Sequence, residues 1–331
     1  MYRRVLGFGD VGFLFRPMAT GGFPETESEM MSNGIAYMLV GDKYGVVITV
    51  SLFSLRRQYD GPVAFIVGDE RAATIGSKIA ADERLGPIEL IRWDAPVGGG
   101  KGLQHCNKTR LPDFTPFDKT IFIDADTLVV GDPTDMFPTN EEVCLSQFAN
   151  WYSNDRKIKR RTEPWREFAP REVARSQGCR YPAINTGTFG IARTSTEYLK
   201  RWRELSEQNP SFMCDELVAQ IIFPDFPHLI FDERWNCSPI FSHDRFGPPN
   251  DVDVRIWHGH GWKFPRRPLG RRVWVPWYDA AVRANVAGVA DWGPDVDGKL
   301  RGMVKDREQL SFDEFYGVAK YGPFQFQPIE D

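Results

Sequence analysis

The stretch KTIFIDADTLVV at residues 119–130 indicates both the fold and the chemistry, because an apolar run ends in two aspartates separated by one residue. Side chains alternate along an extended chain, so Asp124 and Asp126 fall on the same side of it. Two such carboxylates suit a hard divalent cation, Mg²⁺ or Mn²⁺, that completes its shell with water and substrate phosphates. A solvated acidic turn is the alternative, but the flanking residues are apolar, and a buried carboxylate pair without a cation would be costly.

The composition is typical of a soluble globular protein with one large core or two modest ones. Of its 331 residues, 42% are hydrophobic and 26% are charged. The net charge of −4 argues against a nucleic-acid backbone or an anionic membrane as the main partner. Five scattered cysteines lack C-x-x-C spacing and are odd in number, which favours a reducing compartment over a disulfide framework. We therefore expect a cytoplasmic protein without a transmembrane segment.

Apolar runs of strand length alternate with segments of helical spacing along the chain. This alternation predicts an α/β fold with a doubly wound, mainly parallel central sheet flanked by helices. We expect an irregular N-terminal lead-in over 1–33, an ordered domain over 34–270 and a C-terminal extension over 271–331 that packs on the same domain. Ligands of open α/β sheets bind beyond the carboxyl ends of strands, where the aspartate pair lies. Strands are expected at 35–40, 62–67, 88–93, 121–123 and 183–191, and helices at 44–59, 70–85, 196–208 and 214–222.

Four short sequence motifs occur along the chain, and their order and spacing are specific when taken together. They are Gly41–Asp42–Lys43–Tyr44 after the first strand, the aspartate pair, Asn185–Thr186–Gly187, and Asp215–Glu216 ahead of His258–Gly259–His260–Gly261–Trp262–Lys263. In these features, spread over residues 35–263, the chain resembles the retaining glycosyltransferases of family 8, the family of glycogenin and the lipopolysaccharide galactosyltransferases. The resemblance implies the GT-A fold and makes 34–270 the catalytic domain.

The resemblance also assigns metal ligands. It implies that Asp124, Asp126 and His258 hold Mn²⁺ or Mg²⁺ against the diphosphate of a sugar nucleotide, usually UDP. A neutral imidazole beside two carboxylates suits Mn²⁺, and a strand at 256–258 would deliver the histidine to a glycine-rich turn. His260 is the rival ligand, and a packed histidine without a metal role is the plain alternative for His258.

Further positions match residues that contact the donor in the family. Lys263 would neutralise the departing diphosphate, although it stands one residue closer to Gly261 than the family pattern places it. Tyr44 would stack on the base near Asp42, or merely open the first helix, and Lys108 would lie near the donor sugar or phosphates, or be a surface lysine. The predicted donor-binding residues are Gly41, Asp42, Tyr44, Lys108, Asp124, Ala125, Asn185, Thr186, Gly187, Gly261 and Lys263.

Asp215, Glu216 and Lys263 are the predicted catalytic residues. Asn185 and Asp215 match family residues that hydrogen-bond donor-sugar hydroxyls, a task that suits amides and carboxylates; an acidic first turn favoured by the helix dipole is the alternative for 215–216. The family commonly has Gln where this chain has Glu216. A carboxylate beneath the anomeric carbon would act as a nucleophile or stabilise an oxocarbenium-like ion, and both routes retain the configuration. If Glu216 points away from the sugar, Asp215 alone remains.

These observations predict a metal-dependent retaining hexosyltransferase that uses UDP-glucose or UDP-galactose and a hydroxyl acceptor on a carbohydrate, a lipid-linked glycan or a protein. Two alternatives stay open. A sugar-phosphate nucleotidyltransferase usually has a Gly-rich basic loop after its first strand, where this chain has only 41–43, and a non-catalytic carbohydrate-binding or scaffold protein would lack turnover. Sugar and acceptor choice are expected to depend on loops such as 150–180 and 264–331, and the Trp/Arg-rich segment 262–277 is a candidate for peripheral membrane contact.

Overall fold

The computed structural model describes residues 33–41, 45–93, 105–129, 131–238 and 254–258. Within them the chain forms a seven-stranded central sheet with the order β3-β2-β1-β4-β7-β6-β8, and a two-stranded ribbon of β5 and β9. Apart from Asn33, the predicted lead-in lies outside the described residues, as do the predicted extension 271–331 and the segment 262–277. The strands are β1 Asn33–Leu39, β2 Val63–Val67, β3 Ile88–Arg92, β4 Lys119–Ile123, β5 Thr127–Val129, β6 Val143–Tyr152, β7 Pro182–Ala192, β8 His228–Phe231 and β9 Ile256–His258.

The central sheet is mainly parallel and flanked by helices, which confirms the predicted fold class. β1 pairs in parallel with β2 and β4, β2 with β3, and β6 with β8. Strand β7 runs antiparallel to both of its neighbours, β4 and β6. Ile123 at the end of β4 pairs with Thr188, so the residues of β7 before Thr188 continue past the carboxyl end of β4. Residues 185–187 are thereby carried to the place where the aspartate pair leaves the sheet.

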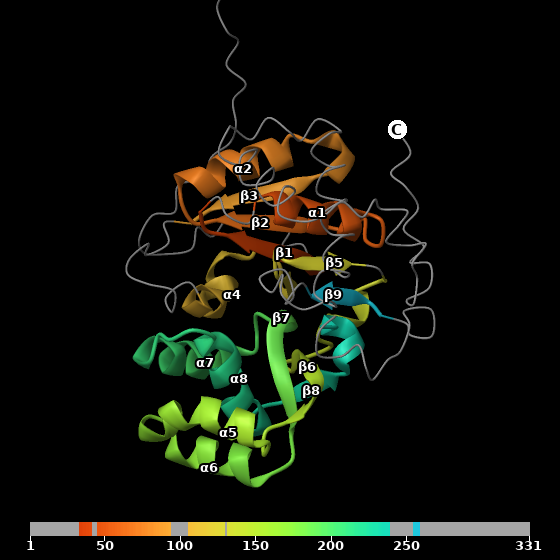
Figure 1. Ribbon diagram of the computed structural model, residues 1–331. Coiled ribbons are helices and arrows are strands. Elements are labelled where there is room, and N and C mark those ends of the chain that lie inside the picture. Colours follow the sequence, from red (N-terminus) through yellow and green to blue (C-terminus); the bar gives the residue numbers. More distant parts are fainter. Residues whose placement is uncertain (1–32, 42–44, 94–104, 130, 239–253, 259–331) are drawn as a thin grey trace, which may run out of the picture.

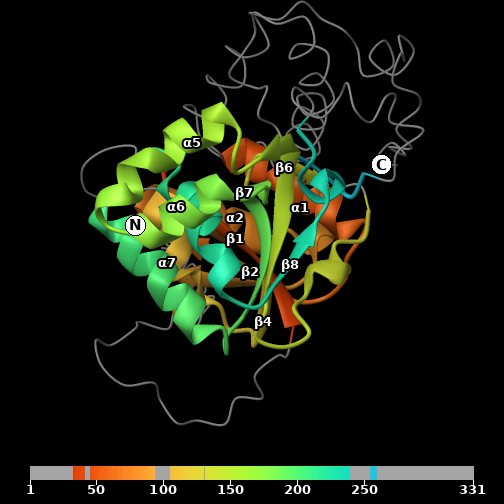
Figure 2. The same ribbon diagram turned by 90° about the horizontal axis from the view of Figure 1, so that it is seen from below.

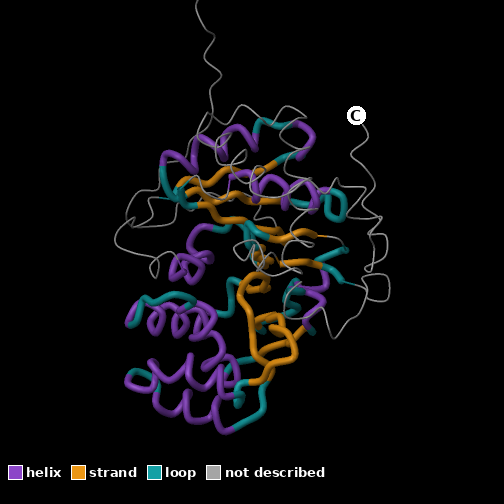
Figure 3. Tube along the Cα trace, viewed as in Figure 1, coloured by secondary structure: helices purple, strands orange, loops and turns teal. Residues whose placement is uncertain are grey.

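Two apolar cores lie on opposite faces of the sheet, because successive side chains of a strand point to opposite faces. Ile35 and Tyr37 of β1 belong to the core that contains residues of α1 and α2, whereas Ala36 between them belongs to the core of α7 and α8. Figure 1 shows α1 and α2 beside β1–β3 and α5–α8 along one side of β6 and β7, and Figure 2 separates α6 and α7 from α1 across the sheet. The helices, purple in Figure 3, are α1 Gly45–Arg56, α2 Glu70–Ala80, α4 Leu111–Phe114, α5 Arg156–Thr162, α6 Pro170–Gly178, α7 Thr196–Gln208 and α8 Cys214–Ile222.

The predicted helices over 196–208 and 214–222 are confirmed with the same bounds, as α7 and α8. The helix predicted over 70–85 ends early, at Ala80, and Glu83–Leu85 form a separate 3₁₀ turn. Its start is fixed by Asp69, whose carboxylate accepts a hydrogen bond from the Ala72 N–H at 2.8 Å. Beyond the turn, Gly86 has a φ of +65°, which a glycine adopts without strain and which takes the chain into β3.

Residues 150–180 were expected as loops, and this expectation is wrong. They contain the end of β6, α5, a 3₁₀ helix at Glu163–Glu167, and α6. Few apolar side chains suffice to fix this unit: Ile158 and Val173 are buried, and Trp165 is only 1% exposed, with its indole N–H donating to the Leu205 carbonyl at 3.4 Å. No helix in the described part of the chain is both long and apolar enough to cross a bilayer.

Candidate metal and donor site

The aspartate pair lies where the chain leaves the central sheet after β4. The Asp124 N–H donates to the Gly187 carbonyl at 2.7 Å, which ties the aspartate to β7. The Thr127 hydroxyl donates to the Asp124 carbonyl at 2.8 Å, which closes a tight turn around Ala125 and Asp126. The turn delivers the chain into β5 and leaves both carboxylates at the carboxyl edge of the sheet. Because residues 124–126 form a turn and not an extended strand, the alternation from which we expected the two side chains on one side does not apply here.

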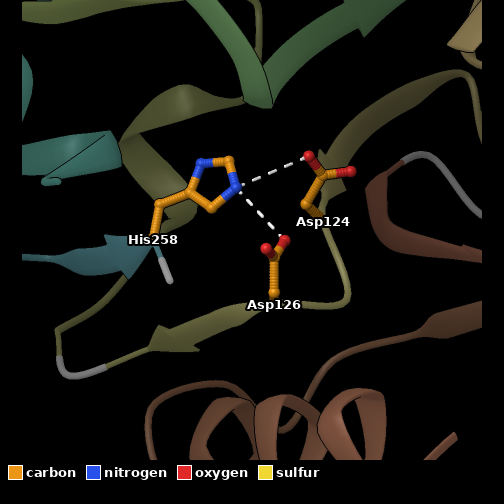
Figure 4. A group of neighbouring side chains, drawn as sticks. All are labelled: Asp124, Asp126 and His258. Atoms are coloured by element: carbon orange, nitrogen blue, oxygen red, sulfur yellow. Dashed lines mark hydrogen bonds and ion pairs between the residues drawn. The ribbon is translucent and has the colours of Figure 1, made fainter. Parts of the chain in front are cut away.

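Strand β9 brings His258 to this turn from far along the chain. It pairs antiparallel with β5, with His258 opposite Thr127, which confirms the predicted strand at 256–258. The Nε2 atom of His258 lies 3.2 Å from Oδ1 of Asp126 and 3.7 Å from Oδ2 of Asp124. Figure 4 shows the imidazole edge facing both carboxylates. One ligand atom from each of these three side chains lies within 4.8 Å of the other two.

These three side chains fit a divalent cation. The imidazole is 5% exposed, and the carboxylates are only partly buried, so the open side of the group is the carboxylate side. Burial alone would lower the pKa of His258, but Asp126 and Asp124 outweigh it and raise the pKa. The two carboxylates thus favour a positive charge next to them, at the imidazole ring. A proton on the ring supplies this charge without a metal, and a bound metal ion would supply it in place of the proton.

Lys108 connects the aspartate pair with Asp215. Its Nζ lies 2.8 Å from Oδ2 of Asp124 and 3.4 Å from Oδ2 of Asp215. Burial would lower the pKa of this ammonium, but the two carboxylates outweigh burial and raise it. Burial likewise opposes ionisation of Asp215, yet Lys108 and His105 together lower its pKa. The net charge of this group is −2, from three carboxylates and one ammonium: Asp124, Asp126, Asp215 and Lys108. A divalent cation would balance that charge.

The segment Asn185–Thr186–Gly187 lies against this group, each residue in a different way. The Thr186 hydroxyl donates to Oδ2 of Asp215 at 2.7 Å, and the backbone carbonyl of Thr186 accepts from Nζ of Lys108 at 3.2 Å. Gly187 packs against His258 so closely that an added Cβ would lie 2.2 Å from Cε1 of the ring. Asn185 is 3% exposed, and its amide bonds within the protein: Nδ2 donates to Glu216 at 2.7 Å, and Oδ1 accepts from the Gly187 N–H at 2.8 Å.

Glu216 and Asp215 begin α8 side by side but face different partners. Oε1 of Glu216 pairs with Arg161 of α5 at 2.8 Å, and Oε2 accepts the Asn185 hydrogen bond. Burial raises the pKa of Glu216, and Arg161 offsets part of that effect. Oδ1 of Asp215 has no hydrogen-bond partner among the described residues, and Nδ1 of His105 lies 3.5 Å from it.

Three residues of this neighbourhood were not among the predicted site residues: Arg161, Asn236 and His105. Arg161 belongs to a basic run in the segment expected as loops. Asn236 ends the 3₁₀ helix Glu233–Asn236, is fully buried, and places its Oδ1 2.7 Å from Nδ1 of His258. His105 and Asn236 belong to no sequence motif, and a basic run does not specify a partner for Arg161, so no local signal could have identified these three residues.

Of the other predicted donor-binding residues, two are described. Gly41 has a φ of +73° and its N–H donates to Asp69 at 2.5 Å, and Ala125 packs against the core of α1 and α2. The remaining positions, and the rival ligand, lie outside the described residues: Asp42, Tyr44, His260, Gly261 and Lys263.

The fold matches those of solved glycosyltransferases. The bifunctional glycosyltransferase WbbM shares 11% identity over 87% of this chain and 53% of its own, with a TM-score of 0.51. The glycosyltransferase GlyE of Streptococcus pneumoniae TIGR4 shares 16% identity over 90% of this chain and 66% of its own, with a TM-score of 0.50. The galactosyltransferase LgtC, solved with donor and acceptor sugar analogues, shares 14% identity over 85% of this chain and 98% of its own, with a TM-score of 0.47.

Neither a protein-family model nor a curated protein sequence matches the chain. The chain spans about half of the WbbM chain and about two thirds of the GlyE chain. At these identities the likeness concerns the fold, and there it agrees with the GT-A fold implied by the sequence motifs.

Proposed function

We propose that this chain, with a GT-A glycosyltransferase fold, is a metal-dependent retaining hexosyltransferase that uses a nucleoside-diphosphate sugar as donor and a hydroxyl as acceptor. The observation that carries the proposal is the convergence of Asp124, Asp126 and His258 at the carboxyl end of β4. Ligands of open α/β sheets bind at such an edge, and this set of oxygen and imidazole ligands suits Mn²⁺ or Mg²⁺. A bound ion would neutralise the diphosphate and so make the nucleotide a better leaving group.

Lys108 and Asp215 have the placement expected of groups that face the donor. Lys108 lies between the aspartate pair and Asp215, so its ammonium can shift toward a phosphate oxygen while it stays close to both carboxylates. Asp215 is held by Thr186 through one carboxylate oxygen, and its other oxygen is left without a hydrogen bond among the described residues. A buried carboxylate oxygen without a donor is costly, and a sugar hydroxyl would satisfy it.

Asp215 is therefore our candidate for the carboxylate that contacts the sugar. Glu216 is held by Arg161 and Asn185, so we assign it to the framework rather than to the reacting centre. In the transfer, the bond between the anomeric carbon and the phosphate oxygen breaks, and a bond to the acceptor oxygen forms. The acceptor's proton goes to the departing phosphate oxygen, and Asp215 stabilises the positive charge that develops on the sugar.

The nucleotide is proposed to be UDP and the sugar glucose or galactose, as the sequence resemblance implies. Gly41, next to the predicted nucleotide contacts Asp42 and Tyr44, lies at the end of β1, beside β4. Lys263, which the resemblance assigns to neutralising the diphosphate, lies outside the described residues. The acceptor is proposed to be a carbohydrate, a lipid-linked glycan or a protein, and the setting cytoplasmic.

Calorimetric titration with UDP and with GDP, each with Mn²⁺ and with EDTA, tests the proposal. We expect UDP to bind in Mn²⁺ and to lose most of its affinity in EDTA. In Asp126→Ala the metal-dependent part should disappear while the circular-dichroism spectrum stays unchanged. The matched control is Asp60→Ala, at an exposed aspartate remote from the site in sequence, which should bind as wild type does. Undiminished binding in Asp126→Ala would refute the metal assignment.

Transfer itself is tested by proton NMR of the anomeric product after incubation with UDP-glucose or UDP-galactose. Retained configuration supports the proposal, and inverted configuration refutes the retaining mechanism. Metal-dependent UDP binding without turnover of either sugar would favour the scaffold alternative.

A further inference from the structure

A buried line of side chains runs from α5 to the candidate metal ligand His258. It starts at Arg161, continues through Glu216 and Asn185, and reaches His258 through Asn236. Apart from Arg161, each member is 5% exposed or less. The hydrogen bonds within the line are short, between 2.7 and 2.8 Å. Water therefore has little access to the bonds that orient the imidazole.

The direction of these bonds is set by one backbone group. The Gly187 N–H can only donate, and it donates to Asn185 at 2.8 Å, so the atom that receives it must be the amide oxygen Oδ1. The same oxygen lies 2.7 Å from the Asn236 amide, which must therefore present its NH₂ group to it. The carbonyl oxygen of Asn236 is then the atom that faces Nδ1 of His258 at 2.7 Å.

An oxygen that faces Nδ1 requires a proton on that nitrogen. Nε2 also faces an acceptor, Oδ1 of Asp126, but at 3.2 Å against 2.7 Å at Nδ1. Both nitrogens are therefore protonated in the imidazolium, and the shorter bond keeps its proton on Nδ1 in the neutral ring. Nε2, the nitrogen that faces Asp124 and Asp126, then carries the lone pair. We propose that Asn236, oriented by Asn185, is a positioning residue that fixes the Nδ1–H tautomer of His258 and directs its Nε2 lone pair at the metal. This inference rests on the proposed function only in naming a metal as the recipient of the lone pair.

The same line accounts for Glu216 in place of the glutamine that is common in the family. Asn185 uses its NH₂ group toward Oε2 of Glu216, and Arg161 offers another donor to Oε1. A carboxylate accepts from both sides, whereas a glutamine would turn its own NH₂ group toward one of these donors. Arg161 and Glu216 are thus a matched pair, and they keep the Asn185 amide in the orientation that Asn236 requires.

Nitrogen NMR of the imidazole tests the tautomer without any substitution. In metal-free protein with ¹⁵N-labelled histidine, at a pH where the ring is neutral, we expect Nδ1 of His258 to be the protonated nitrogen. The resonances are assigned by their loss in His258→Gln. Protonation of Nε2 in the neutral ring would overturn the inference.

Two substitutions that keep the number and branching of side-chain heavy atoms separate the positioning role from a merely structural one. Asn236→Leu removes the acceptor, so we expect the Nε2–H tautomer to gain population and the affinity for Mn²⁺ alone, measured by calorimetry, to fall roughly 10–100-fold. Asn236→Asp keeps an acceptor for Nδ1–H but loses the donor to Asn185, so it should retain the tautomer and most of the Mn²⁺ affinity. Equal loss of affinity in both variants, or wild-type affinity in Asn236→Leu, would contradict the positioning role.

Ser146→Ala is the matched control. The Ser146 hydroxyl lies 3.0 Å from the same Asn236 NH₂ group but does not belong to the line to His258. Its removal should lower stability without changing the tautomer, and Mn²⁺ affinity should stay within about twofold of wild type. The tautomer is read in metal-free protein, so its outcome is independent of the proposed function: absence of Mn²⁺ binding by wild type would refute the metal site, and an Nε2–H ring would refute the role of Asn236.

Discussion

Gly187→Ala is the substitution that most directly tests the placement of His258. The backbone of Gly187 is not left-handed, so the effect of an added methyl group is steric rather than conformational. That Cβ would lie 2.2 Å from Cε1 and 2.3 Å from Nδ1 of His258, where carbon and nitrogen atoms in contact are normally about 3.5–4 Å apart. The ring must therefore retreat by more than about 1 Å, and a metal site tolerates about 0.2 Å in its ligand distances.

We expect the alanine variant to lose His258 as a ligand. The affinity for Mn²⁺ should fall by at least roughly 10–100-fold, and overpacking should lower the free energy of unfolding by about 1–3 kcal/mol. Calorimetry with Mn²⁺ and urea unfolding in EDTA measure the two effects separately. The matched control is Gly178→Ala, because Gly178 ends α6 and an added Cβ there meets nothing within 4 Å. Wild-type Mn²⁺ affinity and stability in Gly187→Ala would show that His258 does not pack where the structure places it.

Three further predictions concern charged groups. Hydrogen bonds from Thr139 and Asn140 outweigh burial and lower the pKa of Glu142 from about 4.5 to about 2. The ionised Glu142 therefore stabilises the fold by about 3 kcal/mol above pH 4.5, and this stabilisation is lost as the pH falls toward 2. The difference in the free energy of urea unfolding between wild type and Glu142→Gln should shrink over that range, and a constant difference would contradict this prediction. Lys108→Met removes one positive charge, so the net charge of the group becomes −3 in place of −2. Mn²⁺ alone should then bind roughly tenfold more tightly in calorimetry while the Mn²⁺–UDP pair binds more weakly, and weakening of both would count against the charge balance. Glu216→Gln should lower the free energy of unfolding by about 3–5 kcal/mol by leaving the Arg161 charge without a counter-charge, and it should lower turnover only through weaker Mn²⁺ binding, so that turnover per folded molecule recovers at saturating Mn²⁺. A stable variant that loses turnover by orders of magnitude at saturating Mn²⁺ would return Glu216 to the role of nucleophile.

The sequence predicted the parts of the fold that have a strong local pattern. The apolar runs of β1, β2 and β4 and the amphipathic helix α7 were found because periodicity survives in a single segment. Strand β6 escaped notice because Ser146 and Gln147 interrupt its apolar pattern, and their partners are residues of β7 nearly forty positions away. Helix α5 escaped notice because six of its seven residues are polar, and its fixed position comes from packing against α6 and α8.

The candidate site also contains residues that a local pattern predicts and residues that no local pattern predicts. The aspartate pair was found because it directly follows the apolar run of β4, and β9 was found because Ile256 and Trp257 precede His258 and a glycine-rich turn. The orientation of His258, by contrast, depends on Asn236 and Asn185, which lie 51 positions apart and meet only in the folded protein. No local spacing encodes that contact, so the residues that orient a ligand were less predictable than the ligand itself.

The short ribbon of β5 and β9 has a consequence for folding. His258 reaches Asp126 across 132 positions of chain, and three residues of pairing hold β9 against β5. Closing so long a loop costs conformational entropy before the contacts of β9 can stabilise the closed form. The β5–β9 ribbon should therefore be among the last parts of the protein to form and the first to open. An ion shared by Asp124, Asp126 and His258 would act as a reversible cross-link over that loop, and each tenfold rise in its free concentration above the dissociation constant would add about 1.4 kcal/mol to the stability of the closed form. Donor-site assembly and the final step of folding would then be one event, and hydrogen exchange at β9 would report both.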